Sequence, residues 1–505
     1  MLRQVKVETG TLRGTPAADP RITAFRGVPF AAPPVGALRW KAPRPAEPWE
    51  GVLEALEFAP IAMQRIPGLA KDDIYTREWN VDPEIPMDED CLYLNVWTPA
   101  KEPGEKLPVF VWYYGGGLQV GNPAEMEFNG ERIARRGIVV VTVNYRVNVF
   151  GFLAHPALTA EDPAFAANFG NLDQKAGTEW VRRNIAAFGG DPSNITIGGQ
   201  SAGGGSVLTQ LASPLTEGLF QKAIVQSGIL LGGYADRTPL RRQALADAEQ
   251  DGEAFFRFLG VNTLEEARAI DACTLRDKAL EYKGFWGTVV DGNYLPAGAM
   301  ERIMRNERHR VPLLMGNTSS EFKAVPEADS FEAFERLARE KFGDRAEEFL
   351  RIVRADTLER TIANATYSPI ELGVRAAYAR TAEKPGAPDN FYYVFDADIP
   401  GWDHPGTFHS VDLWFFFETL AACWRPFTGR HYDLARHMCN YWANFIRSGD
   451  PNGPDADGTP MPAWRPYTDG DGPMVFRDVP AMAEPGSASP LMRFLVDFQL
   501  GAHPV

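Results

Sequence analysis

The segment Ile195-Thr196-Ile197-Gly198-Gly199-Gln200-Ser201-Ala202-Gly203-Gly204 is the most informative part of this sequence. A short β-branched run leads into a G-x-S-x-G pattern, and the small residues after it predict the start of a helix. In a tight strand-to-helix turn the Ser201 hydroxyl can project as a nucleophile, because Gly199 and Gly203 leave room around it. Small residues also occupy such turns in other α/β proteins, so further features are needed.

A second glycine-rich segment supports a nucleophilic serine. Val109 to Tyr114 predicts a buried strand that runs directly into three consecutive glycines. The backbone N–H groups of such a loop can come close to a negatively charged oxygen. Gly116, Gly117 and Ala202 are therefore predicted to form an oxyanion hole. A dinucleotide-binding loop is not expected, since Val120 stands where the last glycine of G-x-G-x-x-G would be.

Apolar runs alternate with helical patterns along the chain, which is typical of an α/β protein with a mostly parallel sheet. A helix is predicted over 173–185, and a second helix, with apolar residues at helical spacing from Leu434 to Phe445, ends at Gly449. No linker, repeat or low-complexity tract divides the chain, so we expect one elaborated domain over 1–505. Besides 109–114, buried strands are predicted at 138–145, 195–197, 223–226 and 311–315.

The composition argues against several kinds of partner and location. With 51 basic and 66 acidic residues the net charge is −15, and no Lys/Arg cluster stands out, so nucleic acid and anionic membrane surfaces are not expected to bind. No run approaches the roughly 18 apolar residues of a membrane span, and the N-terminus has no apolar signal-peptide core. Four scattered cysteines favour a reducing compartment. We therefore expect a cytoplasmic protein, with a monomer favoured.

The sequence predicts neither a cofactor nor a metal site. The acidic stretch 450–457 is similar to a calcium loop, but Pro454 replaces a ligand and no glutamate stands at the twelfth position. A phosphate-binding G-x-x-x-x-G-K-[ST] pattern is absent from the sequence. The expected partner is a small molecule.

Signatures spread over most of the chain point to one family. They are FRGVPFA (25–31), PPVGALRW (33–40), EDCLYLNVW (89–97), the glycine triplet (115–117), NYR (144–146), FGGDP (188–192) and the serine turn. In this order they resemble the type-B carboxylesterases, a group that includes cholinesterases and bacterial para-nitrobenzyl esterases. The resemblance implies the α/β-hydrolase fold and a serine carboxylic-ester hydrolase.

The same resemblance implies the partners of Ser201. Gly316 to Glu321 is similar to the segment that carries the triad acid, and Gly406 to Leu413 is similar to the one that carries the catalytic histidine, here His409. The order Ser, Glu, His is the order that this fold requires. The remaining histidines lie before prolines (His155, His404), in the late helix (His431, His437), in a charged run (His309) and in the tail (His503).

Three positions depart from the family pattern. Gln200 precedes the nucleophile where glutamate is common, and the lost charge predicts weak attraction for choline-like leaving groups. Met63 stands where extracellular relatives carry the cysteine that pairs with the counterpart of Cys91, so no disulfide is expected there. Tyr114 occupies a position where many relatives have histidine.

The predicted reaction proceeds through an acyl-enzyme. His409 takes the proton of Ser201 as the serine attacks an ester carbonyl, and Glu321 orients the imidazole and stabilises its charged form. The three backbone donors stabilise the oxyanion in both tetrahedral steps. By resemblance, Ser227 is a candidate hydrogen-bond partner of the site, with a purely structural serine as the alternative.

A candidate pocket follows from apolar residues near these segments. Leu118, Val325 and the run from Trp414 to Phe417 could line an acyl or alcohol pocket, which would favour small hydrophobic, aryl or alkyl esters. The aromatic run can equally be part of the core. Two alternatives stay open: the same triad could cleave carbamates, amides or thioesters, or the chain could be a catalytically silent, cholinesterase-like binding or adhesion module.

Overall fold

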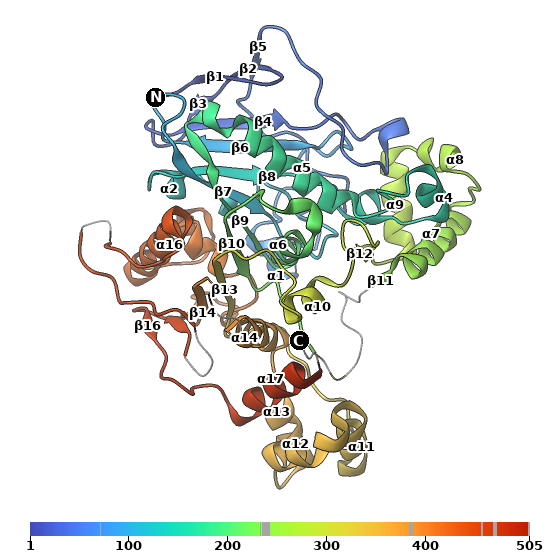
Figure 1. Cartoon of the computed structure of the whole chain (residues 1–505), viewed down its shortest axis with the longest axis vertical. Coiled ribbons are helices and arrows are strands. Elements are labelled where there is room, and N and C mark those ends of the chain that lie inside the picture. The colour runs from blue at the N-terminus through green and yellow to red at the C-terminus, as the bar shows by residue number, and fades with distance from the viewer. Residues whose placement is uncertain are drawn as a thin grey trace.

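A twisted sheet of eleven described strands forms the centre of the molecule (Figure 1). The computed structural model describes residues 1–505 except 71, 233, 235–242, 383–385, 387, 456–457, 468–471 and 503–505. The strand order is β16-β15-β14-β13-β10-β9-β7-β8-β6-β4-β3. The strands are β3 (Thr15–Pro16), β4 (Thr23–Pro29), β6 (Tyr93–Thr98), β7 (Leu107–Tyr113), β8 (Val139–Val143), β9 (Gly190–Gln200), β10 (Lys222–Gln226), β13 (Leu313–Thr318), β14 (Asn390–Phe395), β15 (Met474–Phe476) and β16 (Ala481–Met482).

The central strands run parallel, and antiparallel strands close both edges. From β8 through β7, β9, β10, β13 and β14 to β15, every neighbouring pair is parallel. The pairs β6–β8, β4–β6, β3–β4 and β15–β16 are antiparallel. All five strands predicted from apolar runs are confirmed, with ends that differ by a few residues. Valines and isoleucines that are buried on both faces stabilise these strands, as a sheet covered on two sides requires.

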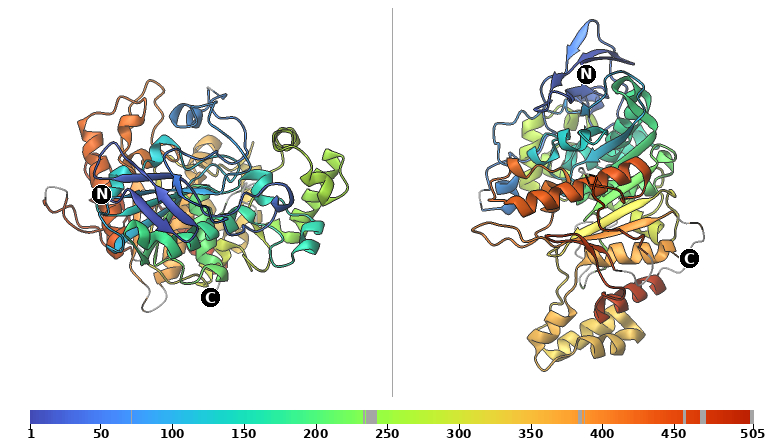
Figure 2. Two further views of the ribbon diagram at one scale, coloured as in Figure 1. Left: turned by 90° about the horizontal axis from the view of Figure 1, so that it is seen from above. Right: turned by 90° about the vertical axis from the view of Figure 1, so that its left-hand side faces the viewer.

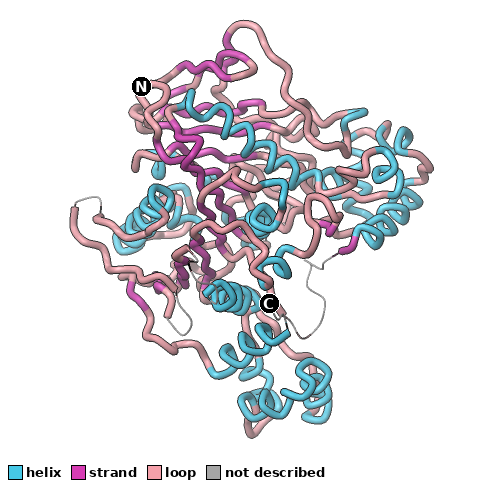
Figure 3. Tube along the Cα trace, in the orientation of Figure 1, coloured by secondary structure: helices cyan, strands magenta, loops and turns pink. Residues whose placement is uncertain are grey.

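Helices cover both faces of the sheet (Figure 3). Helices α5 (Phe169–Asn184), α6 (Ala202–Ala212) and α14 (Pro369–Ala382) lie on one face, and α16 (Gly429–Ser448) lies on the other (Figure 1). The helix predicted over 173–185 is confirmed as α5, whose last turn continues as a 3₁₀ helix. The late helix is confirmed as α16, and Gly449, with a φ of 84°, ends it in the left-handed conformation that glycine adopts easily.

Shorter elements surround this framework. The N-terminal sheet contains β1 (Gln4–Val7), β2 (Gly10–Arg13) and β5 (Val52–Glu54), and β11 (Gln243–Ala244) pairs with β12 (Val289–Val290). The other helices are α1 (Ile74–Glu78), α2 (Glu131–Ala134), α3 (Asn148–Phe152), α4 (Pro156–Glu161), α7 (Leu245–Leu259), α8 (Leu264–Arg268), α9 (Ala272–Tyr282), α10 (Ala299–Met304), α11 (Phe331–Phe342), α12 (Ala346–Val353), α13 (Leu358–Ala365), α15 (Asp412–Phe416) and α17 (Pro490–Ala502).

A small helical lobe projects beyond one end of the sheet (Figure 2). Helices α11, α12, α13 and α17 form it and share a hydrophobic core of their own, in which the Phe342 and Phe349 rings lie 4.4 Å apart. The main core, by contrast, extends over the sheet and the helices that flank it. That the chain forms one domain over 1–505 remains a prediction.

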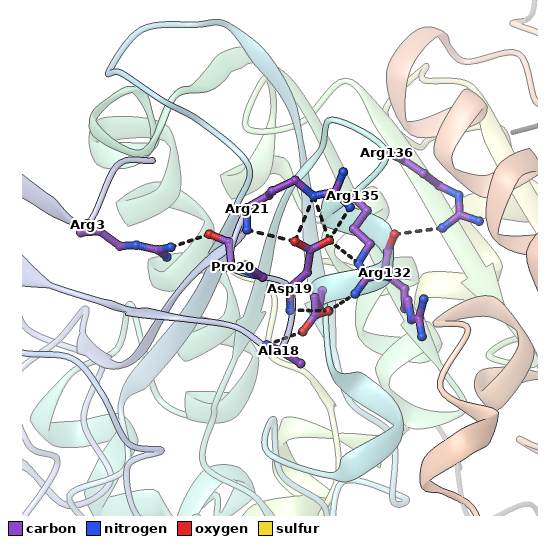
Figure 4. A network of polar contacts seen from close by, with 9 residues as sticks. Arg3, Ala18, Asp19, Pro20, Arg21, Arg132, Arg135 and Arg136 are labelled. Carbon is purple, nitrogen blue, oxygen red and sulfur yellow. Dashed lines mark hydrogen bonds and ion pairs between the residues drawn. The ribbon is translucent and has the colours of Figure 1, made fainter.

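A polar network ties the N-terminal segment to α2 (Figure 4). The Asp19 carboxylate accepts hydrogen bonds from the Arg21 side chain and forms an ion pair with Arg135. The Glu131 carboxylate accepts backbone hydrogen bonds from Ala18 at 2.9 Å and Asp19 at 3.1 Å. The hydrogen bonds from Arg21 and the nearby positive charges hold the pKa of Asp19 well below its usual range. The network thus fixes the antiparallel edge of the sheet against its helical cover.

Helix α6 packs unusually close to the end of β7. A β-carbon placed on Gly203 would lie 2.1 Å from the Tyr113 carbonyl oxygen, a distance that real atoms cannot adopt. A β-carbon on Gly199 would lie 2.4 Å from the Gly203 backbone. The glycines of the serine turn are therefore required by the approach of the strand and the helix, as the sequence pattern predicted.

Gly203→Ala is expected to lower the free energy of unfolding by about 3 kcal/mol or more, because backbone atoms, which cannot rotate away, occupy the new methyl position. Gly205→Ala is the matched control, since its β-carbon would meet nothing closer than the Gly228 oxygen at 3.6 Å. In a helix this control should be neutral or gain up to about 1 kcal/mol. Urea unfolding of both variants measures the difference, and equal stability would contradict the close packing.

Candidate active site

Ser201 occupies a strained backbone conformation between β9 and α6. Its φ of 54° and ψ of −124° are rare for a residue with a side chain, and such conformations cost about 1–3 kcal/mol. Two backbone hydrogen bonds hold the turn: Ser201 N–H donates to the Gln226 carbonyl at 2.9 Å, and Gly205 N–H donates to the Ser201 carbonyl at 2.8 Å. The strain directs the hydroxyl away from the helix and toward His409.

The three residues predicted as a triad form one continuous hydrogen-bonded chain. The Nε2 atom of His409 lies 2.8 Å from the Ser201 hydroxyl oxygen, and its Nδ1 atom lies 2.6 Å from a Glu321 carboxylate oxygen. His409 is 6% exposed and Glu321 is 3% exposed, so water competes little for these contacts. Buried and aligned in this way, a carboxylate, an imidazole and a hydroxyl can transfer a proton from the serine to the histidine.

Two loops bring the acid and the base together. Glu321 follows β13, and His409 lies in the loop before α15. Ser320 and Phe408 form an isolated parallel β-bridge, which sets the two loops in register one residue before the acid and the base. Glu321 and His409 are 88 positions apart in the chain, so only this pairing of loops makes them neighbours.

Glu321 is ionised despite its burial. Burial opposes its charge, but the charge of His409 and the hydrogen bonds from His409, Ser227 and Thr318 outweigh burial and hold the pKa of Glu321 below its usual range. The Ser227 hydroxyl donates at 2.5 Å, and the Thr318 N–H donates at 3.0 Å. Of the two interpretations for Ser227, the structure therefore favours a hydrogen-bond partner of the site.

The predicted oxyanion donors converge beside the serine. Gly116, Gly117 and Ala202 line the same cavity as Ser201, and Ala202 is the first residue of α6. Among the described residues, none accepts a hydrogen bond from the N–H groups of these three positions. Gly116 and Gly117 have φ values of 101° and 66°, which glycine adopts without strain. Unpaired donors at a helix start and a glycine loop are suited to an anionic oxygen.

A cavity of about 600 Å³ opens above the triad. Val325, which was predicted for the pocket, lines this cavity and is 50% exposed, and Gln200 and Ser227 line it as well. The Gln200 side-chain nitrogen lies 3.3 Å from His409 Nε2. Apolar and aromatic side chains form much of the wall, among them Tyr75, Trp79, Phe128, Leu230, Phe285, Phe322, Ile370 and Leu413.

Two pocket predictions are wrong. Leu118 does not line the cavity and packs into the main core with 4% exposure, because the glycine loop turns its side chain inward after Gly117. Trp414 is fully buried, and its indole N–H donates to a Glu78 carboxylate oxygen at 3.2 Å. Phe415, Phe416 and Phe417 are likewise core residues, and their neighbour Leu413 reaches the cavity instead. The alternative of a core aromatic run is therefore the right one.

Several residues near the site escaped the sequence interpretation. Phe322 lies over His409, with ring centres 4.6 Å apart, and Asp412 is a buried acid three positions after the histidine. Glu125 and Glu127 also line the cavity. Two sequence signals could have indicated these acids. One is an acid within an apolar run, as in Ser410-Val411-Asp412-Leu413, and the other is a pair of acids after a glycine loop.

The other candidate features lie elsewhere in the fold. Met63 and Cys91 line one small cavity, and all four cysteines are free. No other described histidine lines the reaction cavity, and His503 lies outside the described residues, as do 456–457 of the acidic stretch. In the described part of the chain no cluster of His, Cys, Asp and Glu could hold a metal ion, and no helix could cross a membrane.

Fold and site together define a serine hydrolase of the α/β-hydrolase fold. The model of the carboxylesterase family matches residues 2–367 and 354–478. The chain belongs to this family and is a carboxylic-ester hydrolase.

Known relatives agree with this assignment. Para-nitrobenzyl esterase of Bacillus subtilis (strain 168) is 32% identical over 470 residues, which cover 89% of this chain and 90% of the relative. Cocaine esterase of Oryctolagus cuniculus is 32% identical over 485 residues, with 88% and 87% covered. Among solved structures, a PNB esterase has a TM-score of 0.77 at 29% identity, covering 98% of this chain and 100% of that one. A Geobacillus stearothermophilus carboxylesterase has a TM-score of 0.75 at 31% identity, covering 98% and 99%.

Ser227→Ala is expected to lower kcat/KM about tenfold or more, because the Glu321 carboxylate loses a charge-assisted hydrogen bond. The pKa of Glu321 should also rise, so activity should be lost at a higher pH as the solution is acidified. The pH profile of kcat/KM measures both effects. Ser193→Ala, at an exposed position near the start of β9, is the control, and equal profiles for the two variants would contradict the role of Ser227.

Asp412→Asn is expected to stabilise the fold, and more so at alkaline pH. Burial raises the pKa of Asp412 to about 6 from 3.8, while the Tyr393 hydroxyl donates to it at 2.7 Å. Because the folded pKa is raised, ionisation costs stability above about pH 6, and this cost fades as the pH falls toward 3.8. The gain from the variant should therefore be about 1 kcal/mol larger at pH 8 than at pH 5. Unfolding at both pH values tests this, and a pH-independent effect would contradict it.

Proposed function

We propose that Ser201, His409 and Glu321 carry out ester hydrolysis in this chain through an acyl-enzyme. The observation that supports this most strongly is the continuous hydrogen-bonded chain of 2.8 Å and 2.6 Å from hydroxyl through imidazole to carboxylate. A silent binding module would not need an aligned, buried triad beside unpaired backbone donors. The geometry therefore favours catalysis.

The reaction follows from the positions of these groups. His409 Nε2 takes the Ser201 proton as the serine oxygen attacks the ester carbonyl carbon, and Glu321 stabilises the resulting imidazolium. Gly116, Gly117 and Ala202 donate hydrogen bonds to the oxyanion of the tetrahedral intermediate. His409 then protonates the departing alcohol. In the second half of the cycle it activates a water molecule, which releases the acid from Ser201.

The proposed substrates are small hydrophobic, aryl or alkyl esters. The cavity of about 600 Å³ is large enough for a drug-sized molecule, and its wall is rich in aromatic side chains. A relative that is named para-nitrobenzyl esterase also supports esters whose alcohol part carries an aromatic ring. We further propose that the protein acts in the cytoplasm, on the basis of its four free cysteines, and that it does not bind nucleic acid, on the basis of its net charge of −15. A monomer stays the favoured state.

Para-nitrophenyl esters of increasing acyl length should give a rapid burst of nitrophenol followed by slower steady turnover, because acylation precedes deacylation. Ser201→Ala should lose the burst and at least about 10⁴-fold in kcat. Stopped-flow absorbance with folded protein at matched concentration measures this. The control is Ser193→Ala, which should keep the burst; turnover that survives in Ser201→Ala would point to another nucleophile.

A further inference from the structure

Two carboxyl groups lie in the wall of the reaction cavity. Glu125 and Glu127 flank Met126 at the start of a 3₁₀ turn (Met126–Phe128), a few residues after the glycine loop. Glu127 has no exposed surface, whereas Glu125 keeps part of its surface open. The two side chains are within hydrogen-bonding contact of each other. Neither takes part in the proposed proton transfers.

No positive charge of the protein balances this pair. Neither acid forms an ion pair with a described Lys, Arg or His, and apart from its contact with Glu125 the Glu127 carboxyl has no side-chain hydrogen-bond partner in the described part of the chain. Glu125 accepts hydrogen bonds from one residue, Asn122, whose backbone N–H lies at 3.0 Å and whose side-chain nitrogen lies at 3.5 Å from the same carboxylate oxygen. A further acid, Glu78, adds to the repulsion that Glu127 experiences, and Arg425 already pairs with Glu78 at 2.7 Å. The cavity therefore contains acceptors without matching donors.

Physical chemistry limits what such a pair can do. Two buried carboxyls in contact repel each other when both are ionised, so when one of them carries a negative charge a proton is shared between them. Burial raises the pKa of both groups, which reflects the cost of a buried negative charge. A positively charged hydrogen-bond donor that enters the cavity would remove this cost and satisfy the free acceptors.

We propose that the Glu125–Glu127 pair is a specificity site for esters whose alcohol or acyl part carries a primary ammonium group. Glu125, the more open of the two, contacts the ammonium, and Glu127 takes the shared proton. The inference rests on the proposed triad, which performs the hydrolysis. It adds a charged substrate class that Gln200, a neutral residue beside the nucleophile, does not suggest.

Other charges at the cavity do not cancel this preference. Arg65 and Lys323 also line the cavity, but both are exposed and form no ion pair with a described residue. Water and salt screen such exposed charges strongly, whereas the buried pair is screened little. A bound ammonium group would therefore experience mainly the field of the two acids.

Matched ester pairs test the proposal. Phenyl 6-aminohexanoate is compared with phenyl heptanoate, and 4-(aminomethyl)phenyl butanoate with 4-ethylphenyl butanoate, because each pair differs only in an ammonium in place of a methyl group. The readout is the ratio of kcat/KM, ammonium ester over neutral ester, in the native protein and its variants. In at least one pair, Glu125→Gln should lower this ratio about tenfold or more.

Glu127→Gln is the matched variant. It removes the same charge, but its amide can donate to Glu125 and leave that carboxylate ionised, so the ratio should be retained or increased. Glu347→Gln, on the exposed surface of α12, should change nothing. Competitive inhibition by benzylammonium gives a second readout, and its inhibition constant should rise about tenfold in Glu125→Gln.

The outcomes separate the two proposals. If the native protein hydrolyses the neutral esters and Ser201→Ala does not, the proposed triad is supported, whatever the ratio of kcat/KM values shows. The specificity site is overturned if Glu125→Gln leaves the ratio of kcat/KM values unchanged in both ester pairs. It is also overturned if Glu127→Gln lowers this ratio as much as Glu125→Gln does. If a variant lowers kcat/KM for both esters of a pair by the same factor and leaves the inhibition constant of benzylammonium unchanged, the acids have a structural role. This result overturns the specificity site as well. Melting temperatures confirm that each variant is folded.

Discussion

The close contact between the serine turn and the end of β7 is the constraint on which the site depends. Gly203 has no side chain because the Tyr113 carbonyl occupies the space where one would begin. This contact fixes the start of α6, and with it the Ala202 N–H, beside the glycine loop that follows β7. The same turn strains Ser201 and points its hydroxyl at His409. Nucleophile and oxyanion donors thus depend on one packing requirement.

Burial then sets the chemistry of the acidic groups around this turn. Glu321 and Asp412 are both buried near His409, yet burial has opposite outcomes for them. Glu321 receives hydrogen bonds from three residues and remains ionised, whereas Asp412 has fewer donors and its pKa is raised. Glu125 and Glu127 have fewest donors of all. The number of donors, more than the depth of burial, decides which acid can serve as the triad carboxylate.

The contrast between Gln200 and the Glu125–Glu127 pair bears on substrate choice. The neutral residue beside the nucleophile removes a charge that relatives commonly carry there, and the sequence therefore predicted little attraction for cations. The cavity nevertheless contains two acids in another part of its wall. A single departure at one position is consequently a poor guide to the electrostatics of a whole cavity, because side chains from distant segments contribute to the same field.

The sequence by itself determined the parallel strands, the helices α5 and α16, the serine turn and, through family signatures, Glu321 and His409. These features depend on local patterns: apolar runs, helical spacing, and glycines where backbone must approach backbone. Only the tertiary structure decided that Leu118 and Trp414 face the core, that Leu413 and Phe322 reach the cavity, and that Glu125 and Glu127 meet within it. The direction of a loop side chain depends on the packing of segments far apart in the chain, and no local pattern encodes that packing.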